Sequence, residues 1–334
     1  MTALSIGDLA QGYVTRHRNT ALKQDMTRLS TEISTGQVTD VRQVMGGNAG
    51  YLVDIESRLE MLSGYDVATS ESALYATGMQ TALTRVGDLS SDLGGKLLIA
   101  GKSAVASAVA HTGHDARAAM DAMVGGLNME IAGRHMFGGT ATDRAPLADA
   151  ETILDALKVA VAGAGTPDEI QLAARDWFDD PAGYKNSAYF GSDEALAPIA
   201  LSQDTSVTLD VTVMDSELRD MLRLTAVAAL AADPALGLDA QAQKELFNTV
   251  GVELIGARDN VISLQAEVGS SQERIDQIAT RHAAEKTSLD YAKSTLLGVD
   301  PYEAATKLEE VQFQLQSLYA VTARMSQLSL LNYL

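Results

Sequence analysis

The chain has 334 residues, which is enough to bury a substantial core, and 46% of them are apolar but only 5% aromatic. The apolar residues are therefore mainly Ala, Leu and Val, which favours long helices over aromatic-rich β-structure. The formal net charge is −19. Because a phosphate backbone or an anionic membrane surface repels such a chain, we expect neither nucleic acid nor membrane among its partners.

The sequence contains no cysteine, which excludes a disulfide framework, a thiolate nucleophile and a sulfur-ligated zinc site. No apolar run reaches the roughly 18 residues that a membrane span needs. The first residues, MTALSIGD, lack the basic head and apolar core of a cleavable signal peptide. If the protein is exported, we expect a route that needs no such signal.

Heptad spacing dominates the N-terminal part of the chain. A first apolar stripe with 4-3-4 spacing consists of Leu22, Met26, Leu29 and Ile33. A longer pattern over residues 52–97 predicts a helix of roughly 70 Å at about 1.5 Å per residue. Glycines within this range leave its continuity open.

The C-terminal part repeats the heptad pattern more strongly. Alternating spacings of four and three run from Val250 to Leu289, and the sequence GVDP at 298–301 interrupts them. Asp300 is a predicted N-cap and Pro301 suits the first turn of the next helix. Sustained repeats of this kind indicate coiled-coil packing.

Residues 141–215 differ from both ends, because they hold most of the prolines and the only tryptophan. Short helices are predicted at 151–161 and 167–177. Residues 206–213 alternate with period two and predict a strand, with 189–190 as a candidate partner. A helix then runs from 216 to about 232, where Asp233-Pro234 ends it.

The predicted fold is mainly α: a long antiparallel helical bundle or coiled coil formed by the N- and C-terminal segments, with a small mixed α/β insert domain. We divide the chain into an N-terminal assembly helix (1–45), long bundle helices (46–140), an outward-facing insert (141–215), returning bundle helices (216–298) and a C-terminal assembly helix (299–334).

Few residues suggest chemistry. His111 and His114 could share one helix face, but Gly113 lies between them and a third metal ligand is missing, so a solvated turn or helix start is favoured. Three nearby carboxylates are interpreted as solvated or capping groups: Asp176, Asp179 and Asp180. Glycine pairs at 46–47, 125–126 and 138–139 match no nucleotide-binding motif. We therefore predict no enzyme, and no catalytic residue, cofactor or metal.

The last seven residues, LSLLNYL, are strongly apolar. Chain ends are usually polar and loose, so an apolar stripe here indicates a covered surface. Either the last helix docks within its own bundle, or it is buried between subunits of an assembly. The two interpretations agree if neighbouring subunits complete the bundle.

Three segments carry a resemblance to a known family. Residues 304–308 (AATKL) and 323–334 (ARMSQLSLLNYL) resemble the C-terminal helix of flagellins and hook-associated proteins, and 25–36 (DMTRLSTEISTG) resembles their paired N-terminal helix. Within this superfamily, residues 133–147 (GRHMFGGTATDRAPL) resemble the hook–filament junction family. That family carries an aromatic-Gly-Thr-x-Thr-Asp-x-Pro pattern where its chain leaves the helical core.

The resemblance implies an extracellular structural protein of the bacterial flagellum, exported by the flagellar type III system and located where hook meets filament. Its implied partners are copies of itself in a ring or tubular lattice, another hook-associated protein on the hook side, flagellin on the filament side and an export chaperone. The residues expected at the assembly interface are Leu22, Met26, Leu29, Ile33, Leu308, Val311, Leu315, Leu318, Met325, Leu328 and Leu331.

Two alternatives stay open. A flagellin that forms the filament would pack its termini in the same way, although the acidic-alanine-glycine loop typical of flagellin is missing from residues 40–50. An unrelated helical protein, such as a secretion-system tip or a cytoplasmic coiled-coil scaffold, would share the heptads but has less reason to end in an apolar helix.

Overall fold

The computed structural model describes residues 6–41 and 49–331, and this part of the chain is mainly helical, as predicted. It forms two compact units, one made of residues 1–63 and 283–334 and the other of residues 64–282. Two long helices, α3 (Ala49–Lys102) and α8 (Ala240–Leu297), contribute residues to both units. We call the first the terminal unit and the second the central unit.

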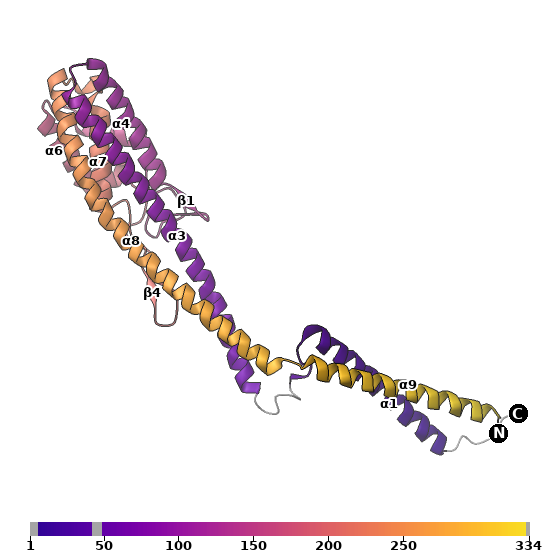
Figure 1. The fold of residues 1–334 in the computed structure, drawn as a ribbon. Helices are drawn as coiled ribbons and strands as arrows, with labels where there is room; N and C mark the ends of the chain where they lie inside the picture. The colour runs from indigo at the N-terminus through magenta and orange to yellow at the C-terminus, as the bar shows by residue number, and fades with distance from the viewer. Residues whose placement is uncertain (1–5, 42–48, 332–334) are drawn as a thin grey trace. The chain divides into compact units, whose positions relative to one another are not determined.

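In the terminal unit, α1 (Ile6–Thr35) and α9 (Pro301–Leu331) lie side by side and run antiparallel (Figure 1). The start of α3 and the end of α8 belong to the same unit. Ion pairs connect these two segments, with Lys293 Nζ 2.8 Å from Glu56 and Arg58 Nη1 3.6 Å from Glu285. The antiparallel pairing of N- and C-terminal segments predicted from the heptads is therefore present.

Hydrogen bonds to the backbone fix the points at which the helices of the terminal unit begin and end. Gly36 closes α1 with a φ of +69°, a conformation that glycine adopts without strain. The Val38 N–H donates to the Leu297 carbonyl at 2.9 Å, and the Val299 N–H donates to the Gly36 carbonyl at 3.0 Å. The predicted break between α8 and α9 is confirmed, because Asp300 caps α9 by accepting from the Tyr302 N–H at 2.8 Å.

In the central unit, α3 and α8 continue as an antiparallel pair whose seam is buried. Gln265 Nε2 donates to Thr84 Oγ1 at 3.1 Å and Gln272 Nε2 to Thr77 Oγ1 at 3.5 Å, so the residue numbers rise along α8 as they fall along α3. The glycines inside α3 do not break the helix. At Gly94 a Cβ atom would stand 3.2 Å from the Gly251 carbonyl oxygen, so the two glycines allow the backbones of α3 and α8 to approach closely.

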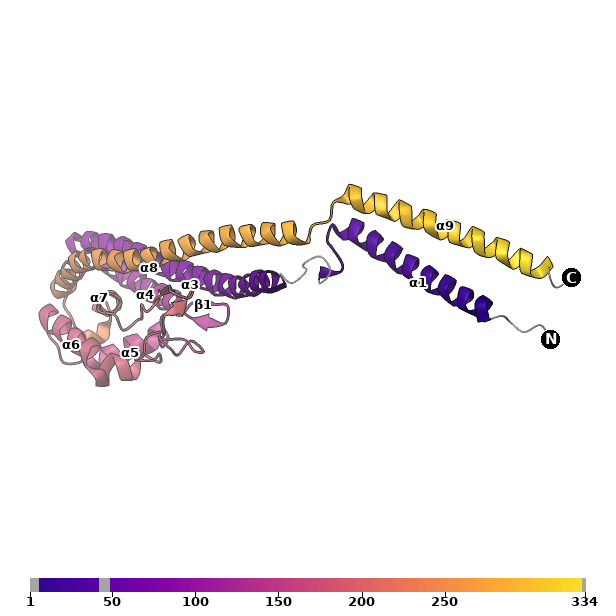
Figure 2. The same ribbon diagram turned by 90° about the horizontal axis from the view of Figure 1, so that it is seen from below.

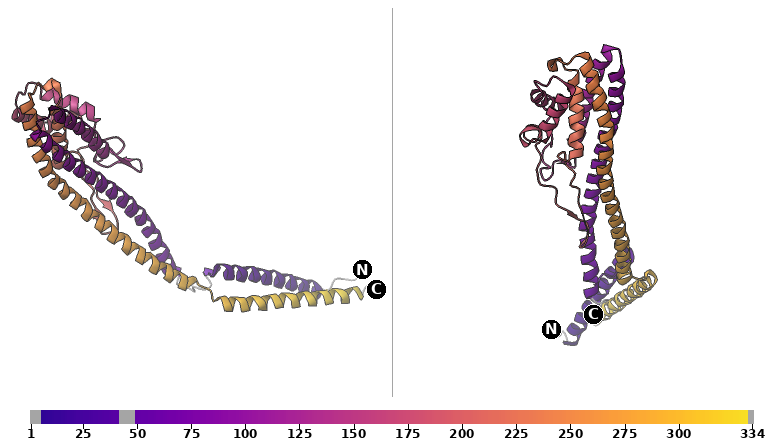
Figure 3. Two further views of the ribbon diagram at one scale, coloured as in Figure 1. Left: turned by 45° about the horizontal axis from the view of Figure 1, so that its top comes forward. Right: turned by 90° about the vertical axis from the view of Figure 1, so that its left-hand side faces the viewer.

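Four further helices pack beside α3 and α8 within the central unit (Figures 2 and 3). They are α4 (Ala106–Leu127), α5 (Ala150–Ala160), α6 (Pro167–Asp179) and α7 (Ser216–Ala231). Two short turns, η1 (Pro181–Lys185) and η2 (Pro234–Leu236), follow α6 and α7. The antiparallel two-stranded pairs are β1 (Glu130–Ile131) with β2 (Arg134–His135), and β3 (Ile199–Ala200) with β4 (Ser206–Val207). The predicted helices of the insert are thus all present, each within two residues of its expected bounds.

The predicted strand at 206–213 is wrong beyond its first two residues, and its partner is β3 rather than residues 189–190. Tyr189 instead forms an isolated bridge with Leu147. Beyond β4 the alternation reflects burial, since every second side chain enters the core: Val207, Leu209, Val211 and Val213. Period-two hydrophobicity reports which side chains face inward, but it does not supply a neighbouring strand to form hydrogen bonds.

A buried carboxylate links three elements of the central unit. Asp233, at the end of α7, lies 2.9 Å from Arg117 on α4 and 3.0 Å from Lys158 on α5. The Ala235 N–H also donates to it at 2.9 Å. This hydrogen bond, together with Lys158 and Arg117, holds the pKa of Asp233 below its ordinary value of 3.8.

We therefore expect Asp233→Asn to destabilise the central unit by about 1–2 kcal/mol at neutral pH, a modest value because both cations are about one third exposed. A lowered pKa stabilises the fold above the unfolded-state value and loses this contribution as the pH falls through the folded-state value. The difference between variant and wild type should shrink below about pH 4, as measured by thermal unfolding. Asp155→Asn is the matched control, because Asp155 is exposed on α5 and forms no ion pair within residues 6–41 and 49–331. Equal effects of the two substitutions would contradict the assignment.

Candidate assembly surface of the terminal helices

The predicted interface residues lie on the faces of α1 and α9 that pack together. Leu22 and Leu29 are buried. Those that are only half-buried are Met26, Ile33, Leu308, Val311, Leu315 and Leu318. Met325 is exposed, and the side chains of Leu328 and Leu331 lie outside the described residues. The structure thus aligns the two predicted stripes, but it does not bury them fully.

The partial burial follows from the number of helices. A helix that packs against one partner covers a single narrow stripe, and the flanks of that stripe stay in water unless further helices cover them. Ala304 on α9 is buried, whereas the leucines and valines further along α9 keep part of their surface exposed. The hydrophobic core of this pair is incomplete.

The outer faces of the pair also carry large apolar side chains, which the sequence analysis did not single out. Tyr302 and Phe313 on α9 are 84% and 70% exposed, and Tyr13 on α1 is 66% exposed. Residues 302 and 313 are separated by about three helical turns, so they lie on one line along α9, opposite the side that meets α1. In the sequence, these residues can be recognised as aromatic residues at positions outside the heptad stripes.

Electrostatic contacts stiffen the end of α1. Glu32 is buried, and its carboxylate accepts from Arg28 Nη1 at 3.2 Å and from the Thr39 N–H at 3.0 Å. Arg28 Nη2 also bonds Asp25 at 3.2 Å. This arrangement ties the chain that follows α1 back onto the helix, so the seam residues near Ile33 are held in place.

The residues considered for chemistry do not converge. His111 and His114 lie exposed on α4, while His282 is buried on the α3–α8 seam with its ring 5.7 Å from that of Tyr65. Residues 6–41 and 49–331 contain no group of three or more His, Asp or Glu side chains arranged to hold a metal ion. Within the same residues, no helix is both long and apolar enough to cross a membrane.

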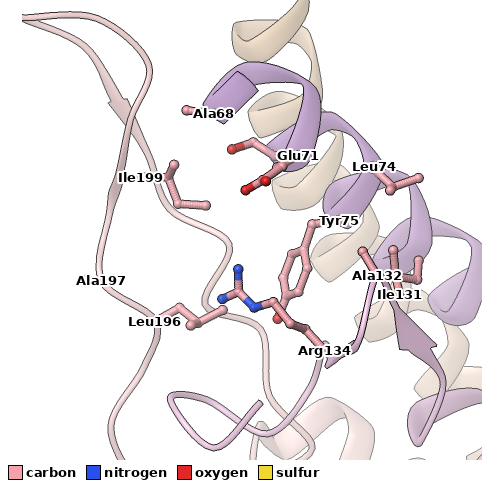
Figure 4. A pocket seen from close by; sticks show the side chains of 11 residues that line it. Ala68, Glu71, Leu74, Tyr75, Ile131, Ala132, Arg134, Leu196, Ala197 and Ile199 are labelled. Carbon is pink, nitrogen blue, oxygen red and sulfur yellow. The ribbon is translucent and has the colours of Figure 1, made fainter. Parts of the chain in front are cut away.

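A mostly apolar pocket of about 380 Å³ opens in the central unit between α3, the β1–β2 hairpin and residues 196–199 (Figure 4). Arg134 stacks over the Tyr75 ring at 5.7 Å, and Glu71 lies on the neighbouring turn of α3. Burial raises the pKa of Tyr75 to about 12, and its hydroxyl donates to the Met136 carbonyl at 2.8 Å. With the tyrosine neutral and bonded, the pocket lining holds no pair of groups poised for acid–base catalysis.

The segment that carries the junction resemblance lies in the central unit and is buried at residues 136–139 and 146–147. Phe137 is fully buried, and its carbonyl accepts from the Val213 N–H at 3.1 Å. The Gly138 carbonyl accepts from the Ser192 N–H at 2.8 Å, and the Thr140 N–H donates to Glu194 at 2.9 Å. The segment therefore joins the exit from α4 to the later part of the insert, at residues 192–194 and 213, which is a structural role.

These features define a helical protein whose central unit has a closed core and whose paired terminal helices have an open one. Comparison with known proteins characterises the C-terminal region. Residues 253–334 match the family model described as the bacterial flagellin C-terminal helical region. This region, which includes most of α8 and all of α9, is flagellin-like, and the resemblance predicted there is confirmed at that level.

Two further comparisons are less informative. No curated protein sequence matches the chain. A solved structure from Vibrio parahaemolyticus, provisionally described as a flagellar hook-associated protein, aligns with 12% identity and a TM-score of 0.49, covering 73% of this chain and 95% of that one.

The two faces of the terminal pair lead to different expectations for the isolated protein. Leu29→Ala should lower the free energy that stabilises the α1–α9 pair by about 2 kcal/mol. Because a pair of isolated helices is only marginally stable, amide exchange in α1 and α9 should accelerate. Phe313→Ala, on the exposed face, should leave that exchange unchanged. Thermal unfolding of the central unit should be the same in both variants. Equal exchange in the two variants would show that the α1–α9 seam does not hold the pair together.

Proposed function

We propose that this chain is a structural subunit of the bacterial flagellum that forms the junction between hook and filament. The proposal rests on two observations that concern the same helix, α9. This helix lies in the region that matches the flagellin C-terminal helices, and it exposes apolar side chains on the face turned away from α1. A flagellin-type helix with an uncovered apolar face is suited to packing against neighbouring subunits.

Assembly would complete the core that the terminal pair leaves open. Each subunit would supply α1 and α9, and the outer residues Tyr13, Tyr302 and Phe313 would be covered by helices of adjacent copies. Head-to-tail contacts of this kind are heterologous, so they build rings or tubes rather than closed dimers. The inner contacts would use the residues predicted from the heptads, with Leu22, Met26, Leu29 and Ile33 opposite the stripe on α9.

The choice of the junction over the filament rests on residues 133–147. Their resemblance to the junction family, together with the missing flagellin loop at 40–50, favours a junction subunit. The partners would then be copies of the chain, another hook-associated protein on the hook side, flagellin on the filament side and an export chaperone. The protein would be extracellular and exported by the flagellar type III system, for which a chain without disulfides is suited.

Labelling of intact flagella distinguishes the two positions. We expect immunogold antibodies against the insert, residues 141–215, to bind in one band where hook meets filament. Gold along the whole filament would identify a filament subunit instead. Absence of gold from flagella of cells that express the protein would contradict a flagellar role altogether.

A pair of exposed-site variants tests whether the outer face of α9 drives assembly. Phe313→Ser should reduce incorporation into flagella at least tenfold, because an aromatic anchor at the centre of an interface contributes about 2 kcal/mol or more. Val159→Ser, at a residue that is 78% exposed on α5 of the central unit, removes an exposed apolar side chain elsewhere. It should incorporate normally, and circular dichroism of both monomers should match wild type. Normal incorporation of Phe313→Ser would exclude this face from the interface.

A further inference from the structure

Three arginines converge on a small pocket at the start of α7 in the central unit. The pocket has a volume of about 250 Å³, and its lining includes Arg175 on α6 together with Arg219 and Arg223 on α7. Asp179 and Asp220 are the carboxylates in the lining. The lining thus holds three guanidiniums and two carboxylates on a chain with a net charge of −19, and a third carboxylate, Glu253, lies 3.8 Å from Arg223.

Arg223 is the most deeply placed of the three, with only 5% of its side chain exposed. Its Nε bonds Asp220 at 3.2 Å, but its Nη2 lies 3.8 Å from Glu253, beyond hydrogen-bond distance. Its Nη1 is buried and has no hydrogen-bond partner in the described part of the chain. A buried guanidinium with an unused donor is costly, so an acceptor that enters the pocket would be stabilised.

Glu253 does not supply the missing acceptor, because its carboxylate accepts hydrogen bonds from Gln171. With its side-chain nitrogen turned toward Glu253, the Gln171 amide donates to both carboxylate oxygens, at 3.2 and 3.1 Å. The Glu253 carboxylate is thus bonded to the Gln171 amide, and Arg223 Nη1 stays without an acceptor among the described residues.

Arg219, in the lining of the same pocket, also has a buried nitrogen without a hydrogen-bond partner among the described residues. Its Nη1 donates to the Phe178 carbonyl at 3.1 Å and pairs with Asp179 at 3.2 Å. Its Nε is buried without a hydrogen-bond partner among the residues that the structure describes. Arg175, by contrast, is exposed and forms no ion pair within those residues. The pocket therefore offers two buried donors and one free guanidinium from neighbouring helices.

The start of α7 borders the same pocket, and its first turn also carries the carboxylate of Glu217. Asp215 occupies the N-cap position, but its side chain makes no capping hydrogen bond to the first turn. The first N–H groups of a helix carry partial positive charge, and Ser216 in this turn is part of the pocket lining.

We propose that this pocket binds a small oxyanion, either a tetrahedral ion such as phosphate or a carboxylate group. Arg175 would supply the entering contact, and the buried donors of Arg219 and Arg223 would complete the coordination by charge-assisted hydrogen bonds. The anion would link α6 to α7 and thereby stabilise the insert. This binding is independent of the flagellar assignment, since it involves only the central unit.

The test is calorimetric titration of the full-length protein with inorganic phosphate and, separately, with acetate, in chloride buffer of matched ionic strength. Saturable binding of phosphate, acetate or both at one site per chain is expected, and the stronger of the two identifies the class of oxyanion. Arg175→Gln should weaken that binding about tenfold or more, because it removes a charge-assisted contact without disturbing the buried network. Arg274 on α8 is exposed and forms no ion pair in the part of the chain that the structure describes, so Arg274→Gln removes the same charge elsewhere and should bind as wild type does.

A second measurement reports on the buried donors without any substitution. The Nε–H resonance of Arg219 should shift with phosphate or acetate concentration, with the same midpoint as the calorimetric titration. The proposal is overturned if neither anion gives saturable binding, or if the two glutamine variants weaken binding equally, since the effect would then be general screening of charge.

Discussion

The structure depends on how much apolar surface a pair of helices can cover. Two helices bury one stripe each, and every other face remains in water unless another element covers it. In the central unit, α4 to α7 provide this cover, and side chains such as Met79, Leu83 and Phe247 are fully buried. In the terminal unit, α1 and α9 have only each other within the described residues, and their seam is half-buried. The same heptad pattern thus gives a closed core in one unit and an open one in the other.

This contrast gives the two units different physical roles. A closed core is stable without partners, and the central unit adds buried polar links such as Asp233 and the ladder around Phe137 and Gly138. An open core gains free energy only when neighbours arrive, so its stability and its assembly are coupled. The match to the flagellin C-terminal helical region falls on residues 253–334, which include α9, the helix with the most strongly exposed aromatic side chains of the terminal pair.

Junction and filament subunits can share this coupling, because both need terminal helices that are completed by adjacent copies. The features that distinguish a junction subunit from a filament subunit must therefore lie outside the seam residues of the terminal helices. Here the segment from Gly133 to Leu147 connects α4 to the insert, and it is buried only at 136–139 and 146–147. Its buried side chains set how the insert is attached, whereas Asp143 and Arg144 lie at the surface. The arginine pocket lies where α6 of the insert meets α7, and it depends on how those two helices pack.

Local sequence signals determined the helices, the interruption at 298–301 with its Asp300 cap, and the residues that line the seams, because heptad spacing and capping are read within a few turns. His282, which falls within the heptad pattern from Val250 to Leu289, is buried on the α3–α8 seam. Tertiary structure decided the rest. The alternation at 206–213 became burial without a strand, and Gly94 proved to be a contact point with Gly251 rather than a helix break. The exposure of Phe313 and the convergence of Arg175, Arg219 and Arg223 depend on which helices become neighbours, and that depends on contacts between residues far apart in the sequence.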